Sequence, residues 1–112
     1  MVDQNPDLAD AAHVKRIGEE AVVDNLKQQG WTNVVLNVRS SNLTDIQAKN
    51  PGGAMHLFQV KTAVSPNTPD NLSESERHAL ISTASRMDAA AFQVKVQLNE
   101  KYAPTRIEYS QL

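Results

Sequence analysis

The tetrapeptide Asn50-Pro51-Gly52-Gly53 constrains the fold of this chain more than any other segment. Proline followed by glycine is typical of a tight turn, and residues 43–49 and 55–62 on either side have the composition of strands. Two strands joined by such a short connection pair antiparallel, because a parallel pair needs a long crossover. The sequence therefore predicts a β-hairpin near the centre of the chain.

Helices and further strands are predicted on both sides of this hairpin. A helix is expected from Asn5-Pro6 to about Gln29, with Gly30 as its stop, and Ser73-Glu74-Ser75-Glu76 is a capping box that opens a second helix. Strands are expected over residues 34–39, 92–98 and, more briefly, 106–109. The order helix, three strands, helix, strand predicts an α/β (α+β) fold with a mixed central sheet, as one domain over residues 1–112.

Helical periodicity predicts which side of each helix is buried. The first helix is expected to bury Leu8, Ala11, Gly18, Val22 and Leu26, with Glu19 at the edge of that stripe. The second is expected to bury Leu80, Ile81, Ala84 and Met87.

Composition excludes several classes of protein. The chain of 112 residues has no cysteine, which excludes disulfides and zinc-thiolate sites, and no apolar stretch long enough to span a membrane. The first residues lack the features of a signal peptide, so we expect a cytoplasmic protein. A net charge of −2 argues against a general electrostatic hold on nucleic acid. A local basic patch remains open, with these candidates: Lys49, Lys61, Arg77, Arg86 and Lys95.

Polar residues stand at four positions where the surrounding sequence is apolar: Glu19, Asp45, Gln59 and Lys61. A charge near a core is costly unless it is paired or binds a metal ion. Carboxylate and amide oxygens are ligands for Mg²⁺ or Mn²⁺, and a nearby lysine can position water or the scissile phosphate. Together they predict a site for metal-assisted phosphodiester cleavage, to which the carbonyl oxygen of Val60 would add a further ligand.

A purely structural role is the alternative for these residues. Asp45 would then end a loop, Gln59 would hydrogen-bond within the sheet, and Lys61 would form an ion pair with Glu19.

The sequence resembles the PD-(D/E)xK nuclease superfamily over roughly residues 14–98, most of all Holliday-junction-resolvase-like proteins and the catalytic domains of Mrr-type restriction enzymes. The resemblance lies in Gly18-Glu19 with Gly30-Trp31, in Asn37-Val38-Arg39, in Thr44-Asp45-Ile46 and in Gln59-Val60-Lys61. It implies a restriction endonuclease-like core of helix, three strands, helix and strand.

The resemblance also implies an activity. Glu19, Asp45, Gln59 and Lys61 would form the active site of an endodeoxyribonuclease, with Mg²⁺ as cofactor and DNA, including branched or modified DNA, as substrate. Resolvase-like relatives pair to cut two strands, which implies a homodimer. Thr44 stands where the family commonly has proline, and Gln59 where it commonly has an acid, although Mrr-type relatives carry this glutamine. One negative charge fewer implies weaker metal binding.

Two other functions remain open. The chain could be a catalytically inactive protein that uses the nuclease fold for binding or assembly, or a small partner protein of a toxin system or mobile element. Lys61 together with Glu19 and Asp45 favours the enzyme, whereas Gln59 and the acidic balance favour the inactive protein.

Overall fold

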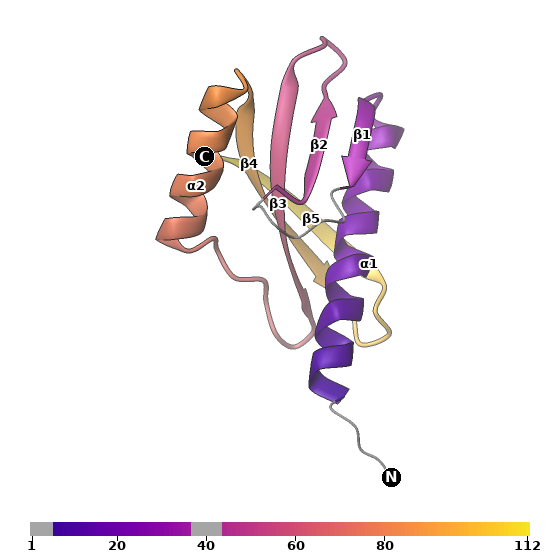
Figure 1. The fold of residues 1–112 in the computed structure, drawn as a ribbon. Helices are drawn as coiled ribbons and strands as arrows, with labels where there is room; N and C mark the ends of the chain where they lie inside the picture. Colours follow the sequence, from indigo (N-terminus) through magenta and orange to yellow (C-terminus); the bar gives the residue numbers. More distant parts are fainter. Residues whose placement is uncertain (1–5, 37–43) are drawn as a thin grey trace.

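The computed structural model describes the backbone of residues 6–36 and 44–112, and side chains from residue 11 onward within these ranges. The elements follow in the predicted order, and Figure 1 shows their arrangement. They are α1 (Pro6–Gln28), β1 (Thr32–Leu36), β2 (Ile46–Lys49), β3 (Met55–Val64), α2 (Glu74–Arg86), β4 (Ala90–Leu98) and β5 (Pro104–Gln111).

The strands form one mixed sheet in the order β1-β2-β3-β4-β5. β2 and β3 pair antiparallel around the turn at Pro51-Gly52, which confirms the predicted hairpin. β3 and β4 are parallel, because α2 carries the chain back between them, and the other neighbouring pairs are antiparallel. The mixed sheet predicted from the element order is therefore confirmed.

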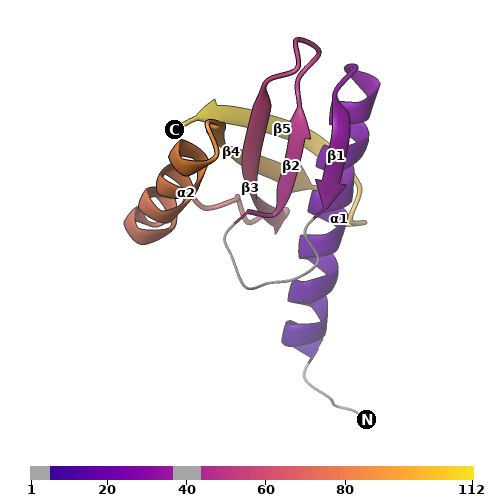
Figure 2. The same ribbon diagram turned by 45° about the horizontal axis from the view of Figure 1, so that its top comes forward.

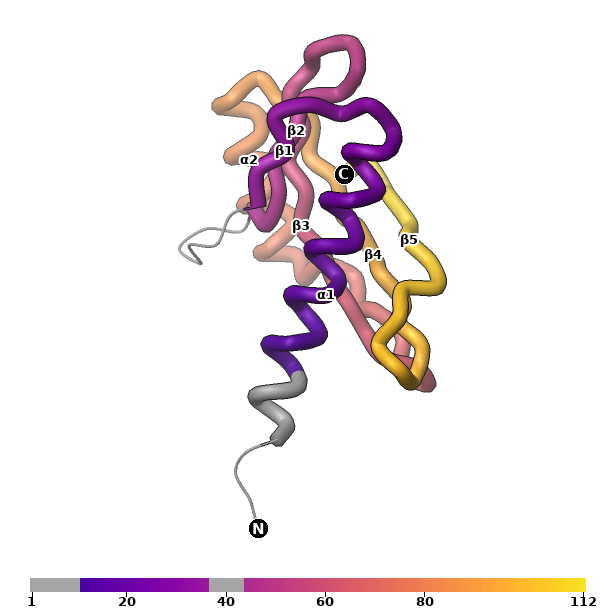
Figure 3. The backbone as a smooth tube through the Cα atoms, turned by 90° about the vertical axis from the view of Figure 1, so that its right-hand side faces the viewer, coloured from indigo at the N-terminus to yellow at the C-terminus, as the bar shows by residue number. Residues whose placement is uncertain are grey.

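The helices cover opposite faces of the sheet. Phe58 belongs to the apolar cluster under α1, whereas its neighbour Leu57 belongs to the cluster under α2. Successive strand residues point to opposite faces, so the two clusters lie on the two sides of β3. Figure 2 shows α1 and α2 on either side of the strands, and in Figure 3 α1 lies nearest the viewer with α2 behind the sheet.

A glycine sets the distance between α1 and β3. A Cβ atom added to Gly18 would lie 1.8 Å from the Thr62 Oγ1 atom, so only glycine permits this approach. Val22 and Leu26, on the same side of the helix, are fully buried in the α1 cluster. The close contact at Gly18 brings the next residue, Glu19, against the sheet.

Several predicted details are wrong or lie outside the described residues. Ala11 is exposed, because the first described turns of α1 have no partner on the sheet. Ile81 and Met87 are 38% and 44% exposed, because α2 buries only Leu80 and Ala84.

The bounds of the strands also differ from the prediction. β2 begins at Ile46 rather than residue 43, and β1 begins two residues earlier than expected. The Leu8 side chain and residues 37–43, with the expected end of β1, lie outside the described residues. β3, β4 and β5 are each longer than predicted.

Neither helix in the described part of the chain is long and apolar enough to cross a membrane.

Candidate active site

Three polar side chains predicted as site residues are buried: Glu19 is 9%, Asp45 8% and Gln59 7% exposed. They come from α1, from the residue before β2, and from β3. Burial of such groups is costly without partners, so their contacts decide what the site can do.

Asp45 is anchored to the hairpin. Its Oδ2 atom accepts a hydrogen bond of 2.8 Å from the Val60 backbone N–H, and its own N–H donates to the Phe58 carbonyl. The register of the hairpin pairs Ile46 with Phe58, so continuing it by one residue places Asp45 opposite Gln59. The hairpin thus holds one carboxylate oxygen and leaves Oδ1 for another partner.

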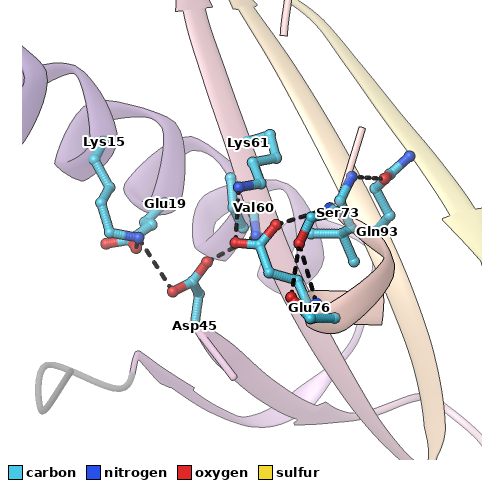
Figure 4. Close-up of polar contacts among 10 residues, drawn as sticks. Lys15, Glu19, Asp45, Val60, Lys61, Ser73, Glu76 and Gln93 are labelled. Atoms are coloured by element: carbon cyan, nitrogen blue, oxygen red, sulfur yellow. Dashed lines mark hydrogen bonds and ion pairs between the residues drawn. The ribbon is translucent and has the colours of Figure 1, made fainter. Parts of the chain in front are cut away.

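That partner is Lys15, which lies one turn before Glu19 on α1. Its Nζ atom is 2.8 Å from Glu19 Oε2 and 3.2 Å from Asp45 Oδ1, so one ammonium group joins both carboxylates (Figure 4). The Lys15 side chain is 56% exposed, whereas those of Glu19 and Asp45 are 12% and 11% exposed. The lysine therefore reaches the buried acids from solvent.

Burial and charge act against each other at these groups. Burial raises the pKa of Glu19, and the Asp45 charge adds to this, while Lys15 lowers it by a hydrogen bond and by its charge without cancelling the rise. Burial lowers the pKa of Lys15, but the hydrogen bonds and charges of Glu19 and Asp45 outweigh it, so the net pKa is raised. The site therefore favours a bound cation and disfavours a second unneutralised acid.

Lys61 lies in a different environment. Its Nζ atom is 3.1 Å from Oε2 of Glu76, a residue in the first turn of α2. Figure 4 shows the two side chains pointing toward each other. Glu76 also accepts a hydrogen bond from the Ser73 backbone N–H in the predicted capping box. The bond to Ser73 N–H, followed by that to Lys61, lowers the pKa of Glu76. Among the described residues, the ammonium of Lys61 thus has Glu76 as its partner rather than Asp45 or Glu19.

Gln59 carries an unpaired acceptor. Its Oε1 atom is buried and has no hydrogen-bond partner among the described residues. A buried carbonyl oxygen without a partner is uncommon and fits a ligand to a hard cation. The two carboxylates fit Mg²⁺ or Mn²⁺, because they already hold a cationic group. Gln59 Oε1 offers a further buried oxygen without a partner in the described part of the chain. No group of three or more His, Cys, Asp or Glu residues converges within the described ranges, so any metal shell here relies on amide and carbonyl oxygens.

The structure therefore brings together Glu19, Asp45 and the Val60 amide, and places Lys61 with Glu76. The alternative ion pair between Lys61 and Glu19 is wrong, since each has another partner. Lys15 and Glu76 were not identified from the sequence. A lysine four residues before Glu19 and a capping-box glutamate were visible signals, because i,i+4 pairs meet on a helix and such a glutamate sits beside the helix start.

Comparison with known proteins defines the class of fold. No family model and no curated protein sequence matches the chain. Among solved structures, the chain is similar to the Holliday junction resolvase Hjc of the archaeal hyperthermophile Archaeoglobus fulgidus. The TM-score is 0.59 at 17% sequence identity, and the match covers 82% of this chain and 74% of Hjc. The chain has a restriction endonuclease-like fold, as the sequence resemblance implied.

Proposed function

We propose that this chain is a metal-dependent endonuclease that cleaves phosphodiester bonds in DNA, with branched DNA as its substrate. The observation that carries the proposal is the position of the Lys15 ammonium between two buried carboxylates, Glu19 and Asp45. Residues that hold one cation in a protected site have the charge needed to hold another. The similarity in fold to a Holliday junction resolvase supports branched DNA as the substrate.

Each site residue has a proposed role. Glu19 and Asp45 would hold Mg²⁺ or Mn²⁺ through charged oxygens, while Gln59 Oε1 and the Val60 carbonyl would add neutral ones. A bound divalent ion would supply stabilisation of charge on the phosphate and lower the pKa of a bound water. Lys61 would position the water or the scissile phosphate, and Glu76 keeps its ammonium group oriented in the free protein.

Basic side chains near Lys61 suggest where the DNA backbone would lie. Lys61 and Lys95 are register partners on the parallel strands β3 and β4, so their side chains point to the same face of the sheet. Phosphate contacts supply most of the affinity of a DNA-binding protein, and they make it dependent on salt. These two adjacent lysines would therefore contact the DNA backbone on a chain whose net charge is −2.

The decisive experiment is cleavage of a synthetic four-way junction, with linear duplex of the same sequence as competitor, in the presence and absence of Mg²⁺. Asp45→Asn retains an acceptor for the Val60 N–H but removes the charge, so we expect cleavage to fall by roughly 100-fold or more. Asp24→Asn is the matched control, because Asp24 is exposed on α1 and is predicted to retain full activity. Cleavage that is unaffected by Asp45→Asn would reject this site.

A catalytically inactive protein that uses this fold for binding or assembly is the second candidate. The ion pair between Lys61 and Glu76 favours it, since it occupies the lysine proposed for catalysis. Junction binding without cleavage at any concentration of Mg²⁺ or Mn²⁺ would support this alternative.

We also propose that the chain functions as a homodimer, with the surfaces of α2 and β4 as the contact. Ile81 on α2 and Met87, the residue that caps its C-terminal end, are large apolar residues that the described chain leaves exposed. Sedimentation at tens of micromolar (a range chosen to detect weak association) tests the proposal, and Ile81→Glu is expected to shift the protein to the monomer. A monomer at all these concentrations would contradict it.

A further inference from the structure

The ammonium group of Lys15 occupies the position between the two buried acids. It contacts Glu19 Oε2 at 2.8 Å and Asp45 Oδ1 at 3.2 Å. These are the carboxylates that the proposed function assigns to the metal ion. A lysine ammonium and a divalent ion bind the same kind of oxygen, so both cannot use these two atoms fully at once.

The charges explain why some cation must be present. Glu19 and Asp45 are both nearly buried, and like charges that lie close together repel each other. Lys15 neutralises one of the two negative charges and leaves one uncompensated. A divalent ion would neutralise both, which favours exchange of the lysine for the metal.

The exposure of Lys15 makes such an exchange feasible. More than half of its side chain is exposed, and it is attached to the outside of α1 by a flexible four-carbon stem. Exposed lysine pairs contribute little to stability, because solvent screens them and the side chain loses rotamer freedom when paired. The pair of Lys61 with Glu76 differs, since both side chains there are mostly covered and the capping box fixes the carboxylate.

We infer that Lys15 is a built-in competitor of the metal ion: it holds the acids of the metal-free site together and is displaced when a divalent cation binds. This inference rests on the proposed function for the identity of the metal ligands. Its consequence is that the protein binds Mg²⁺ more weakly than its oxygen ligands alone would allow. Half-maximal activity would therefore require a higher concentration of the free ion.

The test compares Lys15→Met with Arg16→Met in the full chain. Methionine keeps much of the length and helix propensity of lysine but carries no charge and offers no oxygen to a metal. Arg16 is the matched control, because it lies next along the same helix and pairs with the exposed Glu20, at 4.0 Å, rather than with the two buried acids. Lys15→Arg is a second control that retains a competing charge.

Binding of Mg²⁺ and Mn²⁺ is measured by calorimetry, and melting temperature is measured with and without the ion. In Lys15→Met the ion no longer has to displace the two ion pairs of Lys15, with Glu19 and with Asp45. We therefore expect this variant to bind the ion roughly three- to thirtyfold more tightly than the wild type. Without metal, Lys15→Met should melt below the wild type because the acids repel, and added Mg²⁺ should restore it. Arg16→Met and Lys15→Arg should bind the ion within about twofold of the wild type.

The outcomes separate this inference from the proposed function. Equal Mg²⁺ affinity in wild type and Lys15→Met, with binding abolished by Asp45→Asn, would overturn the competitor role and leave the metal site intact. Tighter binding in Lys15→Met with no cleavage of the four-way junction would support the competitor role and reject the nuclease. Absence of metal binding in every variant would overturn both.

Discussion

The contacts that α1 and α2 make with β2 and β3 differ in their balance of charge. On the α1 side, Glu19 of the helix and Asp45, which precedes β2, share the single ammonium group of Lys15. On the α2 side, Lys61 has one carboxylate partner, Glu76, which the capping box also holds. The first arrangement carries an excess of negative charge, and the second is balanced.

The pKa directions agree with this difference. The pKa of Glu19 is raised, mainly because burial is not fully offset by its shared cation. The pKa of Glu76 is lowered, mainly because the Ser73 N–H and then Lys61 donate to it. Two carboxylates that share one ammonium group keep an excess negative charge and can bind a metal ion. A neutral ion pair instead holds the lysine side chain in place. The comparison therefore assigns cation binding to the α1 side and orientation of Lys61 to the α2 side.

The largest expected effect comes from breaking the close approach of α1. Gly18→Ala places a Cβ atom against the branched Thr62 side chain, which cannot rotate away since its Oγ1, Cβ and Cγ2 atoms all lie within 2.8 Å of the added carbon. We expect a loss of roughly 2–3 kcal/mol in the free energy of unfolding, measured by urea denaturation, despite the better helix propensity of alanine. Gly52→Ala is the control, because an added Cβ there has an ordinary contact with Asn50. Equal stability of both variants would show that α1 is not held at this distance.

Gln59→Glu tests whether the excess of negative charge extends to β3. An acid at position 59, opposite Asp45 in the hairpin register and without a partner among the described residues for its buried oxygen, should cost about 2–3 kcal/mol in the absence of metal. Added Mg²⁺ should recover most of this loss, because hard cations prefer charged oxygens to amides. Thermal melts with and without the ion measure both effects. A loss that Mg²⁺ cannot reverse would place Gln59 outside the metal site.

Tyr109→Phe tests how firmly the far end of α1 is attached to the sheet. The Tyr109 hydroxyl donates to Asn25 Oδ1 at 2.7 Å, and burial raises the pKa of Tyr109 to about 12. Its loss should lower the free energy of unfolding by about 1 kcal/mol. A raised pKa means that the wild type loses stability from Tyr109 as pH rises from about 10 through 12. Denaturation should therefore show a smaller difference in stability between wild type and Tyr109→Phe at pH 11 than at pH 7.

Glu76→Gln gives the smallest expected effect and sharpens the contrast between the two sides. Glutamine can still accept from the Ser73 N–H, so the variant removes the negative charge that pairs with Lys61 and leaves the cap. We expect a loss of about 0.5 kcal/mol at pH 7, measured by denaturant unfolding. Because the pKa of Glu76 is lowered from 4.5, its contribution is present above pH 4.5 and disappears as pH falls through the lowered value. The two proteins should therefore converge in stability at low pH, and a constant difference would contradict the ion pair.

Prediction from sequence succeeded where a local rule was sufficient. The turn at Pro51-Gly52 and the capping box at Ser73 each depend on neighbouring residues, and both are confirmed. The stripe of Val22 and Leu26 follows from helical periodicity alone. The predicted burial of Ile81 and Met87 is wrong. α2 packs on the sheet through Leu80 and Ala84, and helical periodicity alone does not show how wide the buried face is.

The burial of three candidate site residues was predictable from the sequence, but their partners were not. Glu19, Asp45 and Gln59 stood out because polar residues in apolar surroundings need partners, and all three are buried. Their order along the chain also indicated a shared site. Which cation joins which acid depends on distances between elements, and sequence spacing does not supply these.

By itself the sequence determined the order of the elements, the hairpin and the polar residues available to a site, since propensity, turn chemistry and periodicity act over a few residues. Only the tertiary structure decided that Lys15 joins Glu19 to Asp45 and that Lys61 turns to Glu76. The physical reason is that an ion pair forms between groups brought within about 4 Å, and here that distance is set by the packing of α1 and α2 on opposite faces of β3.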